Sequence, residues 1–495
     1  MDSGPDPLPR WAAPAAVTLT AAGWWLAASL QPAWWAAWLA PLPLLAYAAR
    51  APARWAALAT LLAFVLGEMT LWHYIREVIR LPLGACIGIV LMPAVMMVPA
   101  VLLFRALVHR GRPLAAMLSL PLAATGVSCL AAALSPHGTY GHIAYSQMDV
   151  LPLIQVAALT GLWGVGFVVW LFAAMIVVVT LPGIDVGARV RAASGGLLVF
   201  ALAFDYGAWR LHDDDATGGV RVGLVSIALP KGNQVDLDTA SGQRILAAYV
   251  AQMDALAARG AQVVVAPEAS VLVRSHAIPS LQALADRRGV RVLIGAEDRS
   301  DPQHLHNAAL VFEPRTARPV AYYKHHFIPV FEDRYARGTV RTMLPGAPRI
   351  GVAICKDLDF TSTALAYGRR DAQLLLVPAW DFDADAWLHG RMAVLRGVEG
   401  GFAVARTARD GQLTLSDDRG RVLAQASSVG RDAPVTLLGE VPLRETRTPY
   451  ARWGDAFGWL CLLAAAILAL GLGWDPWRDA IARRRTGSSD PRSPR

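Results

Sequence analysis

Long apolar stretches occupy the first two fifths of the chain and return near its end. A membrane-spanning helix needs roughly 20 mostly apolar residues, and seven stretches before residue 211 and one after residue 452 approach or exceed that length. The pattern predicts a multi-span α-helical membrane domain with about eight spans. The predicted spans are Trp11–Leu30, Ala33–Ala48, Trp55–Tyr74, Leu81–Leu103, Pro113–Leu134, Leu151–Thr180, Ala192–Trp209 and Phe457–Gly473.

The pattern changes between the seventh and eighth spans. Short apolar runs rich in β-branched residues alternate there with amphipathic stretches, which is typical of a layered α/β domain. Helices are predicted at 236–260, 278–289 and 383–401. Strands are predicted at 220–227, 261–268, 290–296, 306–313, 318–324, 349–355, 372–380 and 402–407, with a closing hairpin of 412–417 and 421–426.

These patterns divide the chain into four parts. Residues 1–210 form the seven-span domain, 211–452 a domain outside the membrane, and 453–474 the last span. Residues 475–495, rich in arginine, serine and proline, read as a basic disordered tail. The opening MDSGPDPLPRW has a single basic residue, so we expect the first span to be retained rather than cleaved as a signal peptide.

Composition and charge agree with a membrane protein. Hydrophobic residues make up 55% of the 495, and the mean hydropathy of +0.38 excludes an ordinary soluble protein. The net charge of +8 falls mainly in short loops and the tail, so it does not indicate nucleic-acid binding. If the spans alternate, most loop arginines share one side, with Arg76 and Arg80 as exceptions. The arginines on that side are Arg50, Arg54, Arg105, Arg110, Arg112, Arg189, Arg191, Arg478, Arg483, Arg484 and Arg485.

Because positive loops face the cytoplasm, this distribution predicts a multi-pass protein of a bacterial inner membrane, with residues 211–452 outside the cytoplasm. Three of the four cysteines lie in predicted spans, and Cys355 alone lies in the exported domain. That compartment favours disulfides, yet Cys355 has no partner in its own domain. The thiol is therefore either buried and inert or a nucleophile.

Three ionisable side chains stand where predicted strands end. Glu268 ends VVVAPE, Lys324 ends VAYYK, and Cys355 ends GVAIC. Sites in α/β folds collect at the carboxyl ends of strands, and a carboxylate, an ammonium and a thiol form a set of base, charge stabiliser and nucleophile. Each alone has a plain alternative, such as a solvated strand end. All three at equivalent strand ends favour catalysis.

The order and flanks of these residues resemble the carbon–nitrogen hydrolase (nitrilase) superfamily, which has an α-β-β-α sandwich and a Glu/Lys/Cys triad. ICKDLDF is similar to the cysteine motif of that superfamily, and HNAAL to one of its strands. Together with the membrane spans, three further segments resemble the apolipoprotein N-acyltransferase family. These are AYSQMDVLPLIQVAALTGLWGVGF (144–167), YYKHHFIPVFED (322–333) and HGRMAVLRGVEGGFAVARTARDG (389–411).

The chain departs from the family pattern near the cysteine. Lys356 replaces a tyrosine, and Asp357 replaces a glutamate. The stretch from Glu332 to Cys355 is also short, and in the family this stretch carries an apolar loop over the active site. The triad itself is intact.

The resemblance implies an acyltransferase that uses Glu268, Lys324 and Cys355 without a metal or cofactor. A phospholipid would donate an acyl chain to Cys355, and a lipoprotein's N-terminal lipidated cysteine would accept it on its amine. The backbone N–H of Lys356 would support Lys324 in stabilising the oxyanion, Lys324 and Lys356 would favour the thiolate, and Glu332 would orient Lys324. The alternatives are a membrane-tethered hydrolase (amidase) acting on a small polar substrate and a non-catalytic membrane scaffold.

Overall fold

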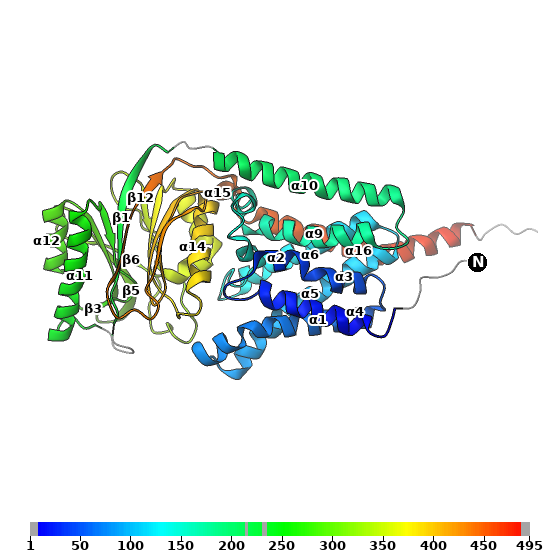
Figure 1. Ribbon diagram of the computed structural model, residues 1–495, viewed down its shortest axis with the longest axis horizontal. Coiled ribbons are helices and arrows are strands. Elements are labelled where there is room, and N and C mark those ends of the chain that lie inside the picture. The colour runs from blue at the N-terminus through cyan, green and yellow to red at the C-terminus, as the bar shows by residue number, and fades with distance from the viewer. Residues whose placement is uncertain (1–7, 213–215, 230–234, 487–495) are drawn as a thin grey trace, which may run out of the picture.

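The computed structural model describes residues 8–212, 216–229 and 235–486. Figure 1 shows two halves side by side along the long axis of the molecule: an α/β sandwich, and a bundle of helices that contains both the first two hundred residues and the last helix. This arrangement confirms the predicted fold class, a helical membrane domain together with an α/β domain.

Five helices of the bundle are long and apolar enough to cross a membrane: α4 extended by the short turn η1, and α5, α6, α9 and α10. Three further apolar helical segments are shorter, so the predicted count of eight spans is not confirmed. The helices of this half are α1 (Ala12–Ala27), α2 (Trp34–Leu39), α3 (Pro41–Ala48), α4 (Ala53–Glu68), α5 (Leu83–His109), α6 (Pro113–Leu134), α7 (Leu151–Ile154), α8 (Ala157–Thr160), α9 (Leu162–Thr180), α10 (Val186–His212), α15 (Pro449–Trp453) and α16 (Ala456–Thr486). The short turns are η1 (Met69–Leu71), η2 (Tyr74–Val78) and η3 (Ile143–Gln147).

Two predicted spans are broken in the structure. The second divides into α2 and α3 just before Pro41, and the sixth into α7, α8 and α9. Gly161, between α8 and α9, has a φ of +68°, and a Cβ atom there would lie 2.4 Å from the ring of Tyr450. Backbone with a positive φ cannot continue a helix. The last helix runs past the predicted end of its span at residue 474, to Thr486.

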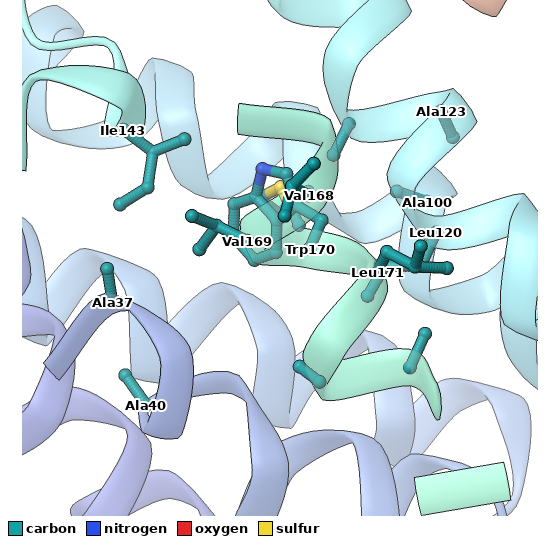
Figure 2. Close-up of a cluster of buried hydrophobic side chains, with 14 of the residues drawn as sticks. Ala37, Ala40, Ala100, Leu120, Ala123, Ile143, Val168, Val169, Trp170 and Leu171 are labelled. Carbon is teal, nitrogen blue, oxygen red and sulfur yellow. The ribbon is translucent and has the colours of Figure 1, made fainter. Parts of the chain in front are cut away.

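The core of the helical half is mainly apolar. Figure 2 shows Trp170 of α9 among side chains from several helices, including Ala40, Ala100 and Leu120. The same apolar cluster includes Leu395 of α14 in the other half of the molecule. The two halves therefore share buried apolar packing rather than meeting through a polar linker.

The α/β half contains two sheets. The larger has the order β12-β1-β2-β4-β5-β6, with β3 paired to β4, and the smaller has the order β11-β10-β9-β8-β7. The strands are β1 (Gly218–Ser226), β2 (Val263–Val265), β3 (Val271–Val273), β4 (Arg291–Asp301), β5 (His304–Phe312), β6 (Val320–Tyr323), β7 (Ile350–Val352), β8 (Leu374–Trp380), β9 (Ala403–Arg409), β10 (Gln412–Ser416), β11 (Val422–Ser427) and β12 (Val435–Leu443).

The sheets face one another in an α-β-β-α sandwich, as predicted. An apolar core fills the space between them. Helices α11 (Ala240–Ala258) and α12 (Pro279–Arg288) cover the larger sheet, and α13 (Thr361–Gly368) and α14 (Ala386–Gly400) cover the smaller. Figure 1 shows α14 between the smaller sheet and the helical bundle. The smaller sheet thus has its helical layer against the membrane half.

Candidate active site

The three strand-end residues lie at one end of the sandwich, between the two sheets. Glu268 follows β2, Lys324 directly follows β6 of the same sheet, and Cys355 follows β7 of the facing sheet. The backbone N–H of Glu268 donates to the carbonyl of Ala379 at the end of β8 (3.3 Å), which ties the two sheets together here. The sandwich fold therefore brings these predicted residues into one site.

Cys355 begins the short 3₁₀ turn η4 (Cys355–Asp359), and its φ is +38°. Non-glycine residues adopt a positive φ at a cost in strain, and such residues cluster at functional sites. The side chain is 8% exposed, and its Sγ lies 3.6 Å from the carbonyl oxygen of Trp380. The first N–H groups of a helical turn have no partner within the turn, so the chain direction after Cys355 suits an oxyanion donor.

Lys324 is held by two carboxylates. Its Nζ donates to Oε1 of Glu268 at 2.7 Å and to both carboxylate oxygens of Glu332, at 2.8 and 2.9 Å. Asn307 of β5 donates its amide to the same two residues, at 2.7 Å to Glu268 and 2.9 Å to Glu332. Glu332 also accepts from the N–H of Ile328 at 2.8 Å. All of these side chains are buried, so the network fixes the lysine and the glutamate in one geometry.

The charges of this network shift the pKa values of its members. Burial raises the pKa of Glu268, the Lys324 ammonium opposes this rise, and the charge of Glu332 adds to it. Burial alone would lower the pKa of Lys324, but Glu268 and Glu332 raise it well above its usual value. Burial and the charge of Glu268 raise the pKa of the Cys355 thiol, and Lys324 acts in the opposite direction. The resting thiol is therefore protonated and needs a base, which Glu268 can be.

Asp357 joins the lysine segment to the cysteine turn. Its carboxylate accepts from the N–H of Ile354 at 3.1 Å, the N–H of His325 at 3.1 Å, the N–H of His326 at 2.9 Å and the hydroxyl of Tyr322 at 2.6 Å. Burial alone would raise the pKa of Asp357, but the hydrogen bond to His326 and nearby positive charge lower it to about 2. An ionised carboxylate therefore aligns the two segments that carry Lys324 and Cys355.

A cavity of about 440 Å³ opens onto Cys355. Its wall is mostly apolar, and it is shared between the two halves of the molecule. The helical half contributes residues of α1, α4, α5, α6 and α9, such as Met96 and Trp170, and the α/β half contributes Cys355, Trp380 and Phe382. Glu268 and Lys324 are not among the described residues that line this cavity, and both act on the thiol that does.

The turn from Ile328 to Val330 also lines the cavity. Val330 is 70% exposed with a φ of +73°, and Phe331 next to it contacts Phe382 with ring centroids 6.0 Å apart. The resemblance suggests an apolar loop between Glu332 and Cys355. In this chain the apolar turn that reaches the cavity precedes Glu332, which is compatible with the short stretch that follows.

Lys356 points away from the triad. Its Nζ lies 2.9 Å from Oδ2 of Asp359 and 3.5 Å from Nδ1 of His137, a residue of the loop between α6 and η3. All three residues line the cavity. In the same loop, the N–H and the hydroxyl of Thr139 donate to the carbonyl of Asp359, at 2.9 and 2.7 Å. The predicted effect of the Lys356 side chain on the thiolate is not seen, since Lys356 pairs with Asp359 instead.

A second polar cluster borders the cavity and was not predicted. His389 of α14 lines the wall, and its Nδ1 lies 3.0 Å from Asp385, which also accepts a hydrogen bond from the hydroxyl of Tyr74. Burial alone would lower the pKa of His389, but Asp385 raises it to about 9. The nearby Asp381 completes a group with metal-ligand atoms. Arg406 already binds both oxygens of Asp381, at 2.5 and 2.9 Å, so this group fits an ion-pair network better than a metal.

The i, i+4 spacing of Asp385 and His389 is visible in the sequence, but an isolated histidine on a helix is usually structural, so the spacing alone does not indicate a site. His137 and Thr139 gave no signal in the sequence, because they contact η4 only across more than 200 residues of chain.

Taken together, the site offers a buried nucleophile, a base with a raised pKa, a fixed ammonium and an apolar cavity. This set can transfer an acyl group through a thioester.

Comparisons with known proteins agree with both halves. Residues 20–175 match the family model described as "Apolipoprotein N-acyltransferase N-terminal domain", and residues 226–448 match "Carbon-nitrogen hydrolase". An apolipoprotein N-acyltransferase from Geobacter metallireducens is 26% identical over 487 residues, which cover 88% of this chain and 90% of that protein. One from Azotobacter vinelandii is 27% identical over 391 residues, covering 70% and 69%.

A solved carbon–nitrogen hydrolase from Helicobacter pylori G27 aligns with 49% of this chain and 94% of its own, at 16% identity and a TM-score of 0.39.

Proposed function

We propose that this chain, which belongs to the apolipoprotein N-acyltransferase family of the carbon–nitrogen hydrolase superfamily, transfers an acyl chain from a phospholipid to the N-terminal amine of a lipoprotein. Its relatives bear that activity in their names, and a multi-pass membrane protein suits two substrates that both reside in a membrane. The catalytic triad in this proposal is Glu268, Lys324 and Cys355.

One observation carries the proposal: the cavity that reaches Cys355 has walls from both the membrane helices and the exported domain. A small polar substrate fits in a pocket within one soluble domain, where a few placed polar groups orient it. Here the nucleophile instead faces an apolar cavity bordered by α5 and α6, two of the helices long enough to span a membrane. An acyl chain can remain among these helices while its ester carbonyl meets the thiol.

In the first half-reaction, Glu268 takes the proton of the Cys355 thiol. The sulfur attacks the ester carbonyl carbon, and a carbon–sulfur bond forms. Lys324, whose charge acts on the thiol, and the N–H of Lys356 stabilise the oxyanion of the tetrahedral intermediate. The ester carbon–oxygen bond then breaks, and the leaving alkoxide takes the proton back from Glu268. The products are a lysophospholipid and a thioester on Cys355.

In the second half-reaction, the neutral α-amine of the acceptor attacks the thioester carbonyl. Glu268 takes a proton from the amine, the carbon–sulfur bond breaks, and the thiolate recovers the proton. The products are an amide and the free thiol. Water must be kept from the thioester while the acceptor arrives. The apolar wall and the apolar turn at Ile328–Val330 meet this need.

The arginine distribution supports a cytoplasmic-membrane location with residues 211–452 on the outer side, where lipoprotein precursors carry their lipidated cysteine. Phospholipid and lipoprotein are the partners in this proposal. Nucleic acid is not among them.

The test is to incubate purified protein with phospholipid labelled in its acyl chain, without an acceptor. We expect label on Cys355 as a thioester that is stable to water and is discharged by a lipopeptide with a free N-terminal amine. Glu268→Gln should form no thioester although it folds. If Cys355 is never labelled while small amides release ammonia, the chain is a hydrolase and the proposal is wrong.

A further inference from the structure

The cavity wall holds one permanent cation. Among the described residues that line it, Lys356 is the single lysine or arginine. The protonated His389 is the other positive group. The carboxylate of Asp385, which does not line the cavity, lies 3.0 Å from Nδ1 of His389 and neutralises its charge. The carboxylates that line the wall are Glu68 and Asp359, and Asp359 is the ion-pair partner of Lys356.

The chain uses lysine rarely. Three of its 46 basic residues are lysine, and the others are arginine. Two of the three, Lys324 and Lys356, are buried beside Cys355, and the third is Lys231, outside the described residues. Arginine serves at exposed positions and also in buried ion pairs, such as that of Arg406 with Asp381. A buried lysine at this point indicates a need for a compact point charge with separate donors.

The ammonium of Lys356 has a donor to spare. An ammonium carries three N–H groups. Asp359 accepts one at 2.9 Å, and the ring nitrogen of His137 at 3.5 Å is at best a weak second acceptor. At least one N–H therefore remains for a group inside the cavity. Lys356 is also the neighbour of the nucleophile in the chain, so such a group would lie close to the reacting carbonyl.

We propose that Lys356 binds the phosphate of the acyl donor and so selects phospholipids over uncharged acyl esters. This inference rests on the proposed acyl transfer. In a glycerophospholipid a few covalent bonds separate the ester carbonyl from the phosphate, so a carbonyl at Cys355 places the phosphate at the polar end of the cavity. Charge-assisted hydrogen bonds to phosphate are among the stronger polar contacts. The lipid is the source of the phosphate because most of the rest of the wall is apolar and suits an acyl chain.

The experiment compares two acyl donors in detergent micelles, a dipalmitoyl phospholipid and p-nitrophenyl palmitate. The rate of thioester formation on Cys355 is measured for each, and the ratio of the two rates is the readout. The neutral ester is each variant's own reference for the chemistry at the thiol. The variants are Lys356→Met and Asp359→Asn, with Arg391→Met as the control, since Arg391 lies on α14 and does not line the cavity.

We expect Lys356→Met to lower the phospholipid-to-ester ratio by about 10-fold or more. Asp359→Asn should raise the ratio, because the phosphate then no longer competes with a carboxylate for the ammonium. Arg391→Met should leave the ratio unchanged. If Lys356 binds phosphate, the ratio changes in opposite directions in Lys356→Met and Asp359→Asn. If the two residues form only a structural ion pair, removal of either one lowers the ratio equally.

Three outcomes would overturn the inference. One is an unchanged ratio in Lys356→Met, and another is an equal fall for Lys356→Met and Asp359→Asn. The third is saturable inhibition of the wild-type reaction by inorganic phosphate that is lost in Lys356→Met, which would make this a site for free phosphate. All three presuppose that the wild type forms a thioester. A wild type that forms none from either donor would instead contradict the proposed acyl transfer.

Discussion

Removing the charge of Glu332 should move the pH dependence of catalysis. Glu332 and Glu268 both accept from Nζ of Lys324, at 2.8 and 2.7 Å, so their nearest oxygens lie about 4.5 Å apart, given the tetrahedral spread of the donors. At an effective dielectric constant of about 20, two unit charges at that distance repel by about 4 kcal/mol. This repulsion helps burial to raise the pKa of Glu268, and the ammonium of Lys324 acts in the opposite direction.

Glu332→Gln should therefore lower the pKa of Glu268. A base with a lower pKa stays deprotonated to lower pH, so the acidic limb of kcat/KM moves to lower pH. The plateau also falls, because the base is weaker. The assay is the acylation of Cys355 by p-nitrophenyl butyrate across the pH range, with folding checked by gel filtration and thermal unfolding.

The matched control is Glu313→Gln. It removes the same charge from a glutamate that is paired with Arg291, six residues beyond Asn307 in the chain. At the rise per residue of a β-strand, Glu313 lies about 20 Å from Asn307. This distance is well beyond the Debye length of about 8 Å at physiological salt. Its acidic limb should match that of the wild type. An acidic limb that stays in place or moves upward in Glu332→Gln would refute the role of Glu268 as the base.

Four further results are expected. Cys355→Ala should abolish thioester labelling while the thermal midpoint changes little, because the thiol lies at the edge of a cavity. Ala132→Phe, which narrows the apolar cavity, should slow acylation by palmitoyl esters more than acylation by butyryl esters. Folded Asp357 has a pKa of about 2, below its unfolded value of about 3.9. Its stabilisation of about 2 kcal/mol is therefore present at pH 7 and lost as the pH falls toward 2. Thermal unfolding should therefore show a smaller loss of stability in acid for Asp357→Asn than for the wild type, since other carboxylates such as Asp385 still titrate in both. A reporter fused after Gly218 should be active only outside the cytoplasm.

Much of the α/β half could be predicted because its strands are buried and regular. Eight predicted strands and both strands of the hairpin are found, whereas β3 and β12 were missed. β3 has only three residues, and β12 is half-exposed and contains Gly439 and Pro442, so neither shows a clean alternation. The helical breaks were missed for a related reason. Hydropathy reports how apolar a segment is, and it does not report the backbone at Pro41 or Gly161.

The candidate triad could be located from the sequence because each member follows a strand, and strand ends converge in this fold. The residues that complete the site could not be located in that way. Asn307 lies inside a strand, and nothing local distinguishes it from a structural asparagine. His137 reaches Lys356 from the other half of the molecule, and only the packing of the two halves creates that contact.

The pairing of β1 with β12 has a consequence for how such a chain can arise. Gly218, at the start of the sandwich, lies opposite Leu443, near its end. The first and last strands of the sandwich therefore have neighbouring ends, and the sandwich is an insertion into the connection between α10 and α15. A complete soluble domain can be inserted into a membrane protein at such a point without a change in the fold of either part. The ends of β1 and β12 also mark where sandwiches from related chains can be exchanged to make chimaeras in which both parts keep their fold.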